Sequence, residues 1–193
     1  MLASIVHGFA NLTRFSGRDP RERFWPYALA LVGAAFVAMI LSFGVGFASN
    51  FQKTIAYAEA HPDKATVTRS GGSVTVTIHE PTPELMPDMA PMFLGLRVIT
   101  PIIVLLLAAA VTRRLHDTGR SGLWGLPPVV FLGVGLALFP SLFQRLMAGD
   151  DSAIGLLLPL FANNLAYLAS LGLLVIFLCL SSKPDANRYG PAA

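Results

Sequence analysis

Charged residues are scarce in this sequence, and cysteine is nearly absent. Asp, Glu, Lys and Arg make up 13% of the 193 residues, against roughly 25% in an ordinary globular protein. The single cysteine, Cys179, cannot form an internal disulfide, so a disulfide-rich secreted scaffold is excluded. Hydrophobic residues reach 54%, which excludes a disordered chain and a soluble enzyme domain. The composition indicates an integral membrane protein.

Motifs of nucleotide, metal and nucleic-acid chemistry are also missing. There is no Walker loop and no G-x-G-x-x-G. The histidines lie in separate segments without the Cys or carboxylate spacing of a zinc site. We therefore expect no metal and no cofactor, and the absence of a catalytic motif favours a non-enzymatic protein. Nucleic acid is not an expected partner, because the basic residues lie beside apolar runs.

Four apolar runs are long enough to cross a bilayer, which takes about 20 residues. They cover residues 25–48, 92–112, 123–142 and 153–180. The fourth run is longer than one crossing needs, so it either tilts or begins as an interfacial segment before Asn163. The sequence predicts an all-α integral membrane protein with four transmembrane helices, forming a single domain over residues 1–193.

Basic residues gather on one side of these four helices. If both termini are inside, the inner segments carry nine basic residues against four acidic ones, and the outer segments carry four against seven. The positive-inside rule then places both termini in the cytoplasm. The nine inner basic residues are Arg14, Arg18, Arg21, Arg23, Arg113, Arg114, Arg120, Lys183 and Arg188.

The predicted outer loop, residues 49–91, contains a β-hairpin pattern. Val67, Val74 and Val76 alternate with Thr and Ser around Gly71-Gly72, which predicts a hairpin over residues 65–78. An isolated hairpin is only marginally stable, so we expect it to lean on the helix ends or to pair with another copy. A proline-rich run, Pro81, Pro83, Pro87 and Pro91, leads back to the membrane.

Two helical stripes suggest packing faces. Apolar residues in the segment 1–15 recur at helical spacing, typical of a helix in the membrane interface or of a short helix packed on the bundle. Small residues recur every four positions in the first span, which lets a helix of the same chain or of a second copy approach closely. These small residues are Ala30, Ala34, Ala38, Ser42 and Gly46.

Three short motifs stand on the predicted cytoplasmic side. They are Phe15-Ser16-Gly17-Arg18 leading to Arg21, Phe24 and Trp25; residues 113–122, RRLHDTGRSG; and residues 187–191, NRYGP. In this order they resemble the bacterial inner-membrane family called domain of unknown function 805. The resemblance covers nearly the whole chain and implies a small four-helix protein of the bacterial inner membrane. It implies no activity, and the connection 49–91 looks longer than the family needs.

The middle motif predicts a sharp helix end. If the second span continues to Asp117, Arg113 and Asp117 lie one turn apart and can pair. Gly119 is suited to stop that helix, and Ser121 to cap the next one. The guanidinium groups then converge at the membrane surface, where arginines bind phosphate bidentately.

This convergence leaves two hypotheses open. One is a binding site for an anionic ligand or lipid head group, made of Arg18, Arg21, Arg113, Arg114, His116, Asp117, Arg120 and Arg188. The other is a topogenic charge cluster in which Arg–Asp pairs lock the helix ends.

The functional prediction follows the same division. The sequence favours a non-enzymatic structural, lipid-binding or partner-binding protein. The alternative is a membrane enzyme or carrier for an anionic substrate, with His116 and Asp117 as acid or base. Expected partners are membrane lipids, a second copy of the chain or another membrane protein.

Overall fold

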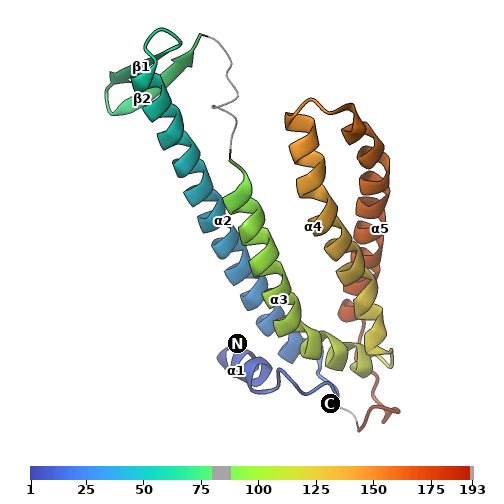
Figure 1. The fold of residues 1–193 in the computed structure, drawn as a ribbon. Helices are drawn as coiled ribbons and strands as arrows, with labels where there is room; N and C mark the ends of the chain where they lie inside the picture. The colour runs from blue at the N-terminus through green and yellow to red at the C-terminus, as the bar shows by residue number, and fades with distance from the viewer. Residues whose placement is uncertain (80–87, 192–193) are drawn as a thin grey trace. The chain divides into compact units, whose positions relative to one another are not determined.

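The computed structural model of the chain describes residues 1–79 and 88–191. Within them, four helices are long and apolar enough to cross a membrane (Figure 1). These are α2 (Arg21–Ala60), α3 (Ala90–Asp117), α4 (Leu126–Met147) and α5 (Ile154–Cys179). Short 3-10 turns, η2 (Gly122–Gly125) and η3 (Asp151–Ala153), precede α4 and α5. The prediction of four helices able to span a membrane is confirmed. Pro81, Pro83 and Pro87 of the proline-rich run lie outside the described residues.

The outer surfaces of these helices are apolar. Phe36 is 67% exposed, Leu105 71% and Leu158 74%. A protein with such large apolar side chains exposed on every long helix would aggregate in water. In the hydrocarbon of a membrane the same side chains contact lipid tails. The exposure pattern therefore agrees with a multi-pass membrane protein.

Two predicted boundaries differ from the structure. The first helix does not end at residue 48 but continues to Ala60, so residues 49–60 of the predicted loop are helical. Its last turns contain three alanines together with Gln52, Lys53 and Glu59. These residues favour helix, although the polar ones end the apolar run. In the fourth run α5 is continuous through Asn163 and Asn164, and the Asn163 amide donates to the Phe131 carbonyl of α4 (3.0 Å).

The chain divides into two compact units, Met1–Phe36 with Arg97–Ala193, and Val37–Leu96. In the second unit, β1 (Ala65–Ser70) and β2 (Ser73–Ile78) form the predicted antiparallel hairpin. Gly71 and Gly72 have positive φ values of 56° and 83°, the conformation that a two-residue hairpin turn requires. The hairpin contacts the end of α2, because Arg69 forms an ion pair with Glu59. In the same unit Gly95 of α3 packs against Ser42, a member of the small-residue stripe.

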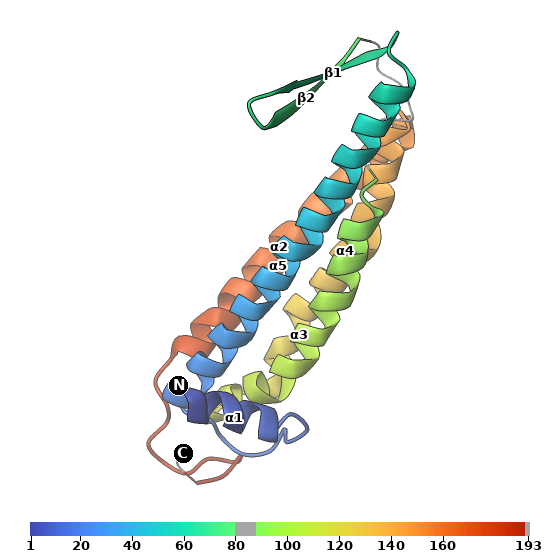
Figure 2. The same ribbon diagram turned by 90° about the vertical axis from the view of Figure 1, so that its left-hand side faces the viewer.

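In the first unit, α1 (Leu2–Ala10) lies across the beginning of α2 (Figures 1 and 2). Gly8 is buried against the ring of Tyr27, so closely that a Cβ atom at Gly8 would overlap the ring. Phe9 meets the same ring edge to face, with centroids 5.5 Å apart. The N-terminal stripe is thus a short helix packed on α2, and its Leu2 and Val6 side chains stay exposed, as an interfacial position also requires.

The buried core of this unit lies at the end of the helices nearest to α1. Residues at the start of α2 pack there against the last turns of α3 and α5, next to the charged motifs. The core consists of Phe24, Tyr27, Ala28, Leu31, Ala110, Leu115, Leu174 and Leu178.

The end of α3 is set by local sequence, as predicted. The Arg120 amide donates to the Leu115 carbonyl and the Gly119 amide to the His116 carbonyl, both at 2.9 Å. This is the Schellman pattern, and it requires the positive φ of 78° at Gly119. Ser121 then accepts a hydrogen bond from the Leu123 amide and caps η2.

Candidate anion-binding site

Asp117, at the end of α3, is fully buried between two arginines. Arg18 donates to its Oδ1 through Nε (3.1 Å), and Arg114, one turn earlier on α3, donates to its Oδ2. Asp117 and Arg114 are both 0% exposed, and Arg18 is 8% exposed. Because an unpaired charge is costly in such a place, the three side chains depend on each other.

The remaining donors of these two arginines bind backbone carbonyls near the C-terminus. Arg114 donates to the carbonyls of Leu178 (3.0 Å) and Leu180. Leu178 lies in the last turn of α5 and Leu180 is its C-cap. Carbonyls at a helix C-terminus lack partners within the helix, so Arg114 caps α5. Arg18 donates to three carbonyls of the tail, those of Lys183, Asp185 and Pro191. The cluster thereby fastens the C-terminal tail to the end of α3.

Arg113 and Asp19 form a second buried ion pair beside the first. Arg113 Nε donates to Asp19 Oδ2 (2.6 Å), and its Nη1 donates to the Asn11 carbonyl (2.8 Å). The Asp19 amide donates in turn to the Arg113 carbonyl (3.2 Å). His7 Nε2 lies 3.1 Å from Asp19 Oδ1, and Arg23 lies 3.8 Å from the same oxygen. This pair fastens α1 and the start of α2 to α3.

The predicted pairing of Arg113 with Asp117 is therefore wrong. Arg18 pairs with Asp117 of α3, and the next residue, Asp19, pairs with Arg113 of α3. Within α3, Asp117 pairs instead with Arg114, three residues earlier. Helix geometry allows both the i+3 and the i+4 partner, and the distant residues Arg18 and Asp19 decide between them.

The other predicted site residues lie at the edge of these pairs. The His116 ring stacks on Tyr189, with centroids 3.7 Å apart and ring planes 4° from parallel. Arg120 lies over the Phe177 ring (4.3 Å) and Arg188 over Tyr189 (4.7 Å). Arg21 is exposed and pairs with Glu22. The structure thus places Arg18, Arg113, Arg114 and Asp117 in the buried ion pairs, whereas Arg21 takes part in an exposed pair with Glu22.

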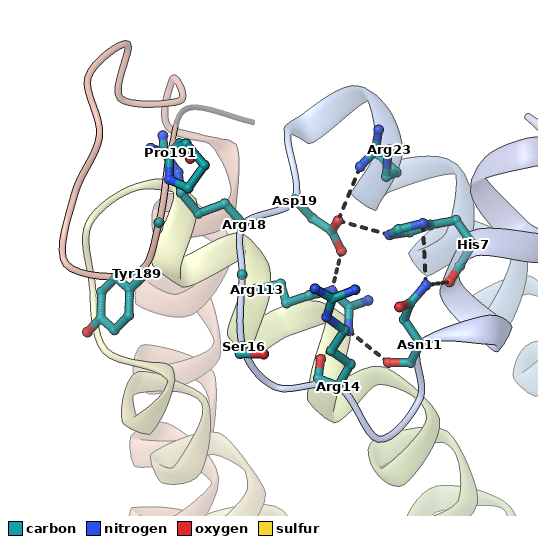
Figure 3. Close-up of a pocket in the computed structure, with 12 residues that line it drawn as sticks. His7, Asn11, Arg14, Ser16, Arg18, Asp19, Arg23, Arg113, Tyr189 and Pro191 are labelled. Atoms are coloured by element: carbon teal, nitrogen blue, oxygen red, sulfur yellow. Dashed lines mark hydrogen bonds and ion pairs between the residues drawn. The ribbon is translucent and has the colours of Figure 1, made fainter.

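A cavity of about 310 Å³ opens beside the Arg113–Asp19 pair (Figure 3). Its wall comes from α1 and the segment after it, the start of α2, the end of α3 and the C-terminal tail. Four arginines face one carboxylate there. The charged and polar lining residues are His7, Asn11, Arg14, Ser16, Arg18, Asp19, Arg23, Arg113 and Tyr189.

Two of these arginines retain free donors. Arg14 is exposed, and its guanidinium has no hydrogen-bond partner within residues 1–79 and 88–191. The Arg23 side chain is 48% exposed and only within ion-pair distance of Asp19. Arg18 and Arg113, by contrast, are the predicted site residues that line the cavity, and their donors are largely used. The guanidinium groups of Arg14 and Arg23 are thus the ones in the cavity lining with donors left unused by buried contacts.

Sequence reasoning missed Arg14, Arg23, His7 and Asn11 as members of the site. Arg14 and Arg23 entered only the count of inner charges. The available signal was the i, i+4 spacing of His7, in α1, and Asn11, its C-cap, which places both on one side of the helix end. The Asn11 side-chain amide donates to the His7 carbonyl (2.8 Å).

A family model described as Protein of unknown function (DUF805) matches residues 12–191. The chain belongs to this family. No curated protein and no solved structure matches the chain.

In this DUF805 protein the three motifs of the sequence meet at one place. Arg18 of the first motif binds Asp117 of the second and the Pro191 carbonyl of the third. The side-chain amide of Asn187, in the third motif, donates to the His116 carbonyl of the second (3.0 Å). The motifs therefore build the buried ion-pair cluster and one wall of the cavity.

Proposed function

We propose that this DUF805 protein is a non-enzymatic protein of the bacterial inner membrane, with both termini in the cytoplasm, that binds a phosphate-bearing anion in its basic cavity. The buried ion pairs hold the cavity walls in place. Arg14 and Arg23 supply the hydrogen bonds to the anion.

The charge of the cavity carries this proposal. Four arginines and one aspartate line it. The guanidinium groups of Arg14 and Arg23 have N–H donors that no buried contact uses. The planar fork of an arginine matches two oxygens of a phosphate. Because Arg18 and Arg113 are fixed by buried contacts, the wall is preorganised and loses little freedom on binding.

A non-enzymatic role agrees with the state of the candidate acid and base. Asp117 is fully buried, and its two carboxylate oxygens are bound by arginines. His116 lies against Tyr189 and does not line the cavity among the described residues. Neither group is placed to exchange a proton with a molecule in the cavity.

The distribution of charge supports the cytoplasmic orientation. Eight of the nine basic residues predicted to be inside lie in the motifs or beside them. Four of the nine, Arg14, Arg18, Arg23 and Arg113, line the cavity, so the positive-inside rule places the cavity on the cytoplasmic side. A basic cavity at the inner surface faces both anionic lipid head groups and soluble phosphates. These two sources share one chemistry and must be separated by experiment.

Native mass spectrometry of the detergent-solubilised protein tests the proposal. The protein is mixed separately with phosphatidylglycerol, with phosphatidylcholine of the same chains, and with inorganic phosphate. We expect bound phosphatidylglycerol or phosphate, and little phosphatidylcholine. In Arg14→Gln/Arg23→Gln, binding weakens about tenfold or more, since a hydrogen bond to a charged group contributes about 1.5–3 kcal/mol.

The matched control is Arg21→Gln/Arg145→Gln, which removes the same charge from two exposed arginines outside the cavity lining. We expect this variant to bind as the wild type does. Equal weakening in both variants, or equal retention of phosphatidylglycerol and phosphatidylcholine by the wild type, would contradict the proposal.

A further inference from the structure

A second, apolar cavity lies between the helices of the first unit. Its volume is about 450 Å³, within the range of about 300–1,000 Å³ that is common for ligand sites. All four long helices contribute to its wall. Representative lining residues are Val32, Leu107, Val111, Val129, Leu132 and Leu171.

Residues next to each other in the sequence line both this apolar cavity (the apolar groove) and the basic cavity of the candidate site. Phe15 lines the groove, whereas Arg14 and Ser16 on either side of it line the basic cavity. On α3, Thr112 lines the groove and the next residue, Arg113, lines the basic cavity. The same two stretches of chain thus wall both cavities, one polar and one apolar.

We infer that the ligand is an anionic phospholipid, with its phosphate in the basic cavity and one acyl chain in the apolar groove. The inference rests on the function proposed above and names its ligand class. The groove is walled by membrane-spanning helices, where the solvent is hydrocarbon. An acyl chain fills such a space and restores the contacts that an empty one would lose.

A soluble phosphate would leave the groove without a role. A phosphate-bearing lipid uses both cavities at once, and the arginines select its charge. In hydrocarbon the acyl chain gains little from leaving other lipid tails, so the head group supplies the affinity and the groove fixes the position of the chain.

Photo-crosslinking locates the chain directly. The full-length protein is reconstituted into phosphatidylcholine nanodiscs containing a small fraction of phosphatidylglycerol with a diazirine in its acyl chain. After irradiation, peptide mass spectrometry maps the adducts. We expect adducts concentrated on groove residues such as Val111, Leu132 and Leu171, and far fewer with a phosphatidylcholine probe carrying the same chain.

A matched pair of variants tests the groove itself. Ala108 lines it, so Ala108→Phe fills it; Ala137 is exposed on α4 outside the lining, so Ala137→Phe serves as the control. We expect Ala108→Phe to lose the groove adducts and Ala137→Phe to keep them. The wild-type map is decisive even if Ala108→Phe does not fold.

Adducts spread evenly over the lipid-facing helices, or equal groove labelling by both probes, would overturn the inference. The failure of the two proposals is distinguishable. If anionic lipid still binds through Arg14 and Arg23 while the groove stays unlabelled, the proposed function holds and the acyl-chain position is wrong. If only inorganic phosphate binds, the ligand is soluble and this inference is wrong.

Discussion

At the scale of single residues, the arrangement depends on two carboxylates that each serve more than one cation. Asp117 is shared by Arg18 and Arg114, and Asp19 by Arg113 and Arg23. Both carboxylates are buried. The burial makes each of them hard to replace, because its removal leaves arginines without a counter-charge.

Asp117→Asn tests this dependence. The variant retains the size of the side chain but leaves Arg18 and Arg114 buried around a neutral amide. We expect a loss of about 3–5 kcal/mol in unfolding free energy, measured as reversible unfolding in detergent micelles. Glu22→Gln also removes one acidic charge, at an exposed pair, and should destabilise the protein far less, because solvent screens that pair. Equal stability of the two variants would show that the buried cluster contributes little.

At the scale of secondary-structure elements, the closest contact between α1 and α2 described above is at Gly8. Gly8 packs on the ring of Tyr27 with no room for a side chain, and the His7–Asp19 contact lies next to it. Because His7 and Asn11 line the basic cavity, the position of α1 also sets the shape of the proposed site.

Gly8→Ala tests the docking of α1. The added methyl group must push α1 away from Tyr27, so we expect faster amide hydrogen exchange over residues 2–10 and weaker binding of phosphatidylglycerol. Gly33→Ala is the control, because a Cβ atom there meets open space and alanine raises helix propensity by about 1 kcal/mol. Unchanged exchange in Gly8→Ala would mean that α1 is not held by this contact.

At the scale of the whole molecule, the parts that local sequence determines were predicted and the parts that distant residues determine were not. The hairpin follows from Gly71-Gly72 and alternating valines, and the end of α3 follows from Gly119. The choice of Arg114 rather than Arg113 as the partner of Asp117 depends on Arg18, which is 99 positions away. Likewise, hydropathy marks where apolar residues end, so it missed the polar last turns of α2.

The orientation across the membrane gives a further prediction. In a Cys179→Ala background, Ser73→Cys marks the hairpin turn and Thr13→Cys marks the segment after α1; both positions are exposed. With a membrane-impermeant maleimide on intact spheroplasts, we expect Ser73→Cys to be labelled and Thr13→Cys to be labelled only after permeabilisation. The opposite pattern would place the basic cavity outside and contradict the positive-inside assignment.

The central claim is that the basic cavity holds a phosphate-bearing anion through Arg14 and Arg23. The most direct measurement is the amount of tightly bound phosphorus per chain in protein purified from its membrane and washed extensively in detergent. The account predicts phosphorus in about a one-to-one ratio to the wild-type chain, a strong reduction in Arg14→Gln/Arg23→Gln, and no reduction in Arg21→Gln/Arg145→Gln. A wild-type protein that carries no more phosphorus than Arg14→Gln/Arg23→Gln would contradict it.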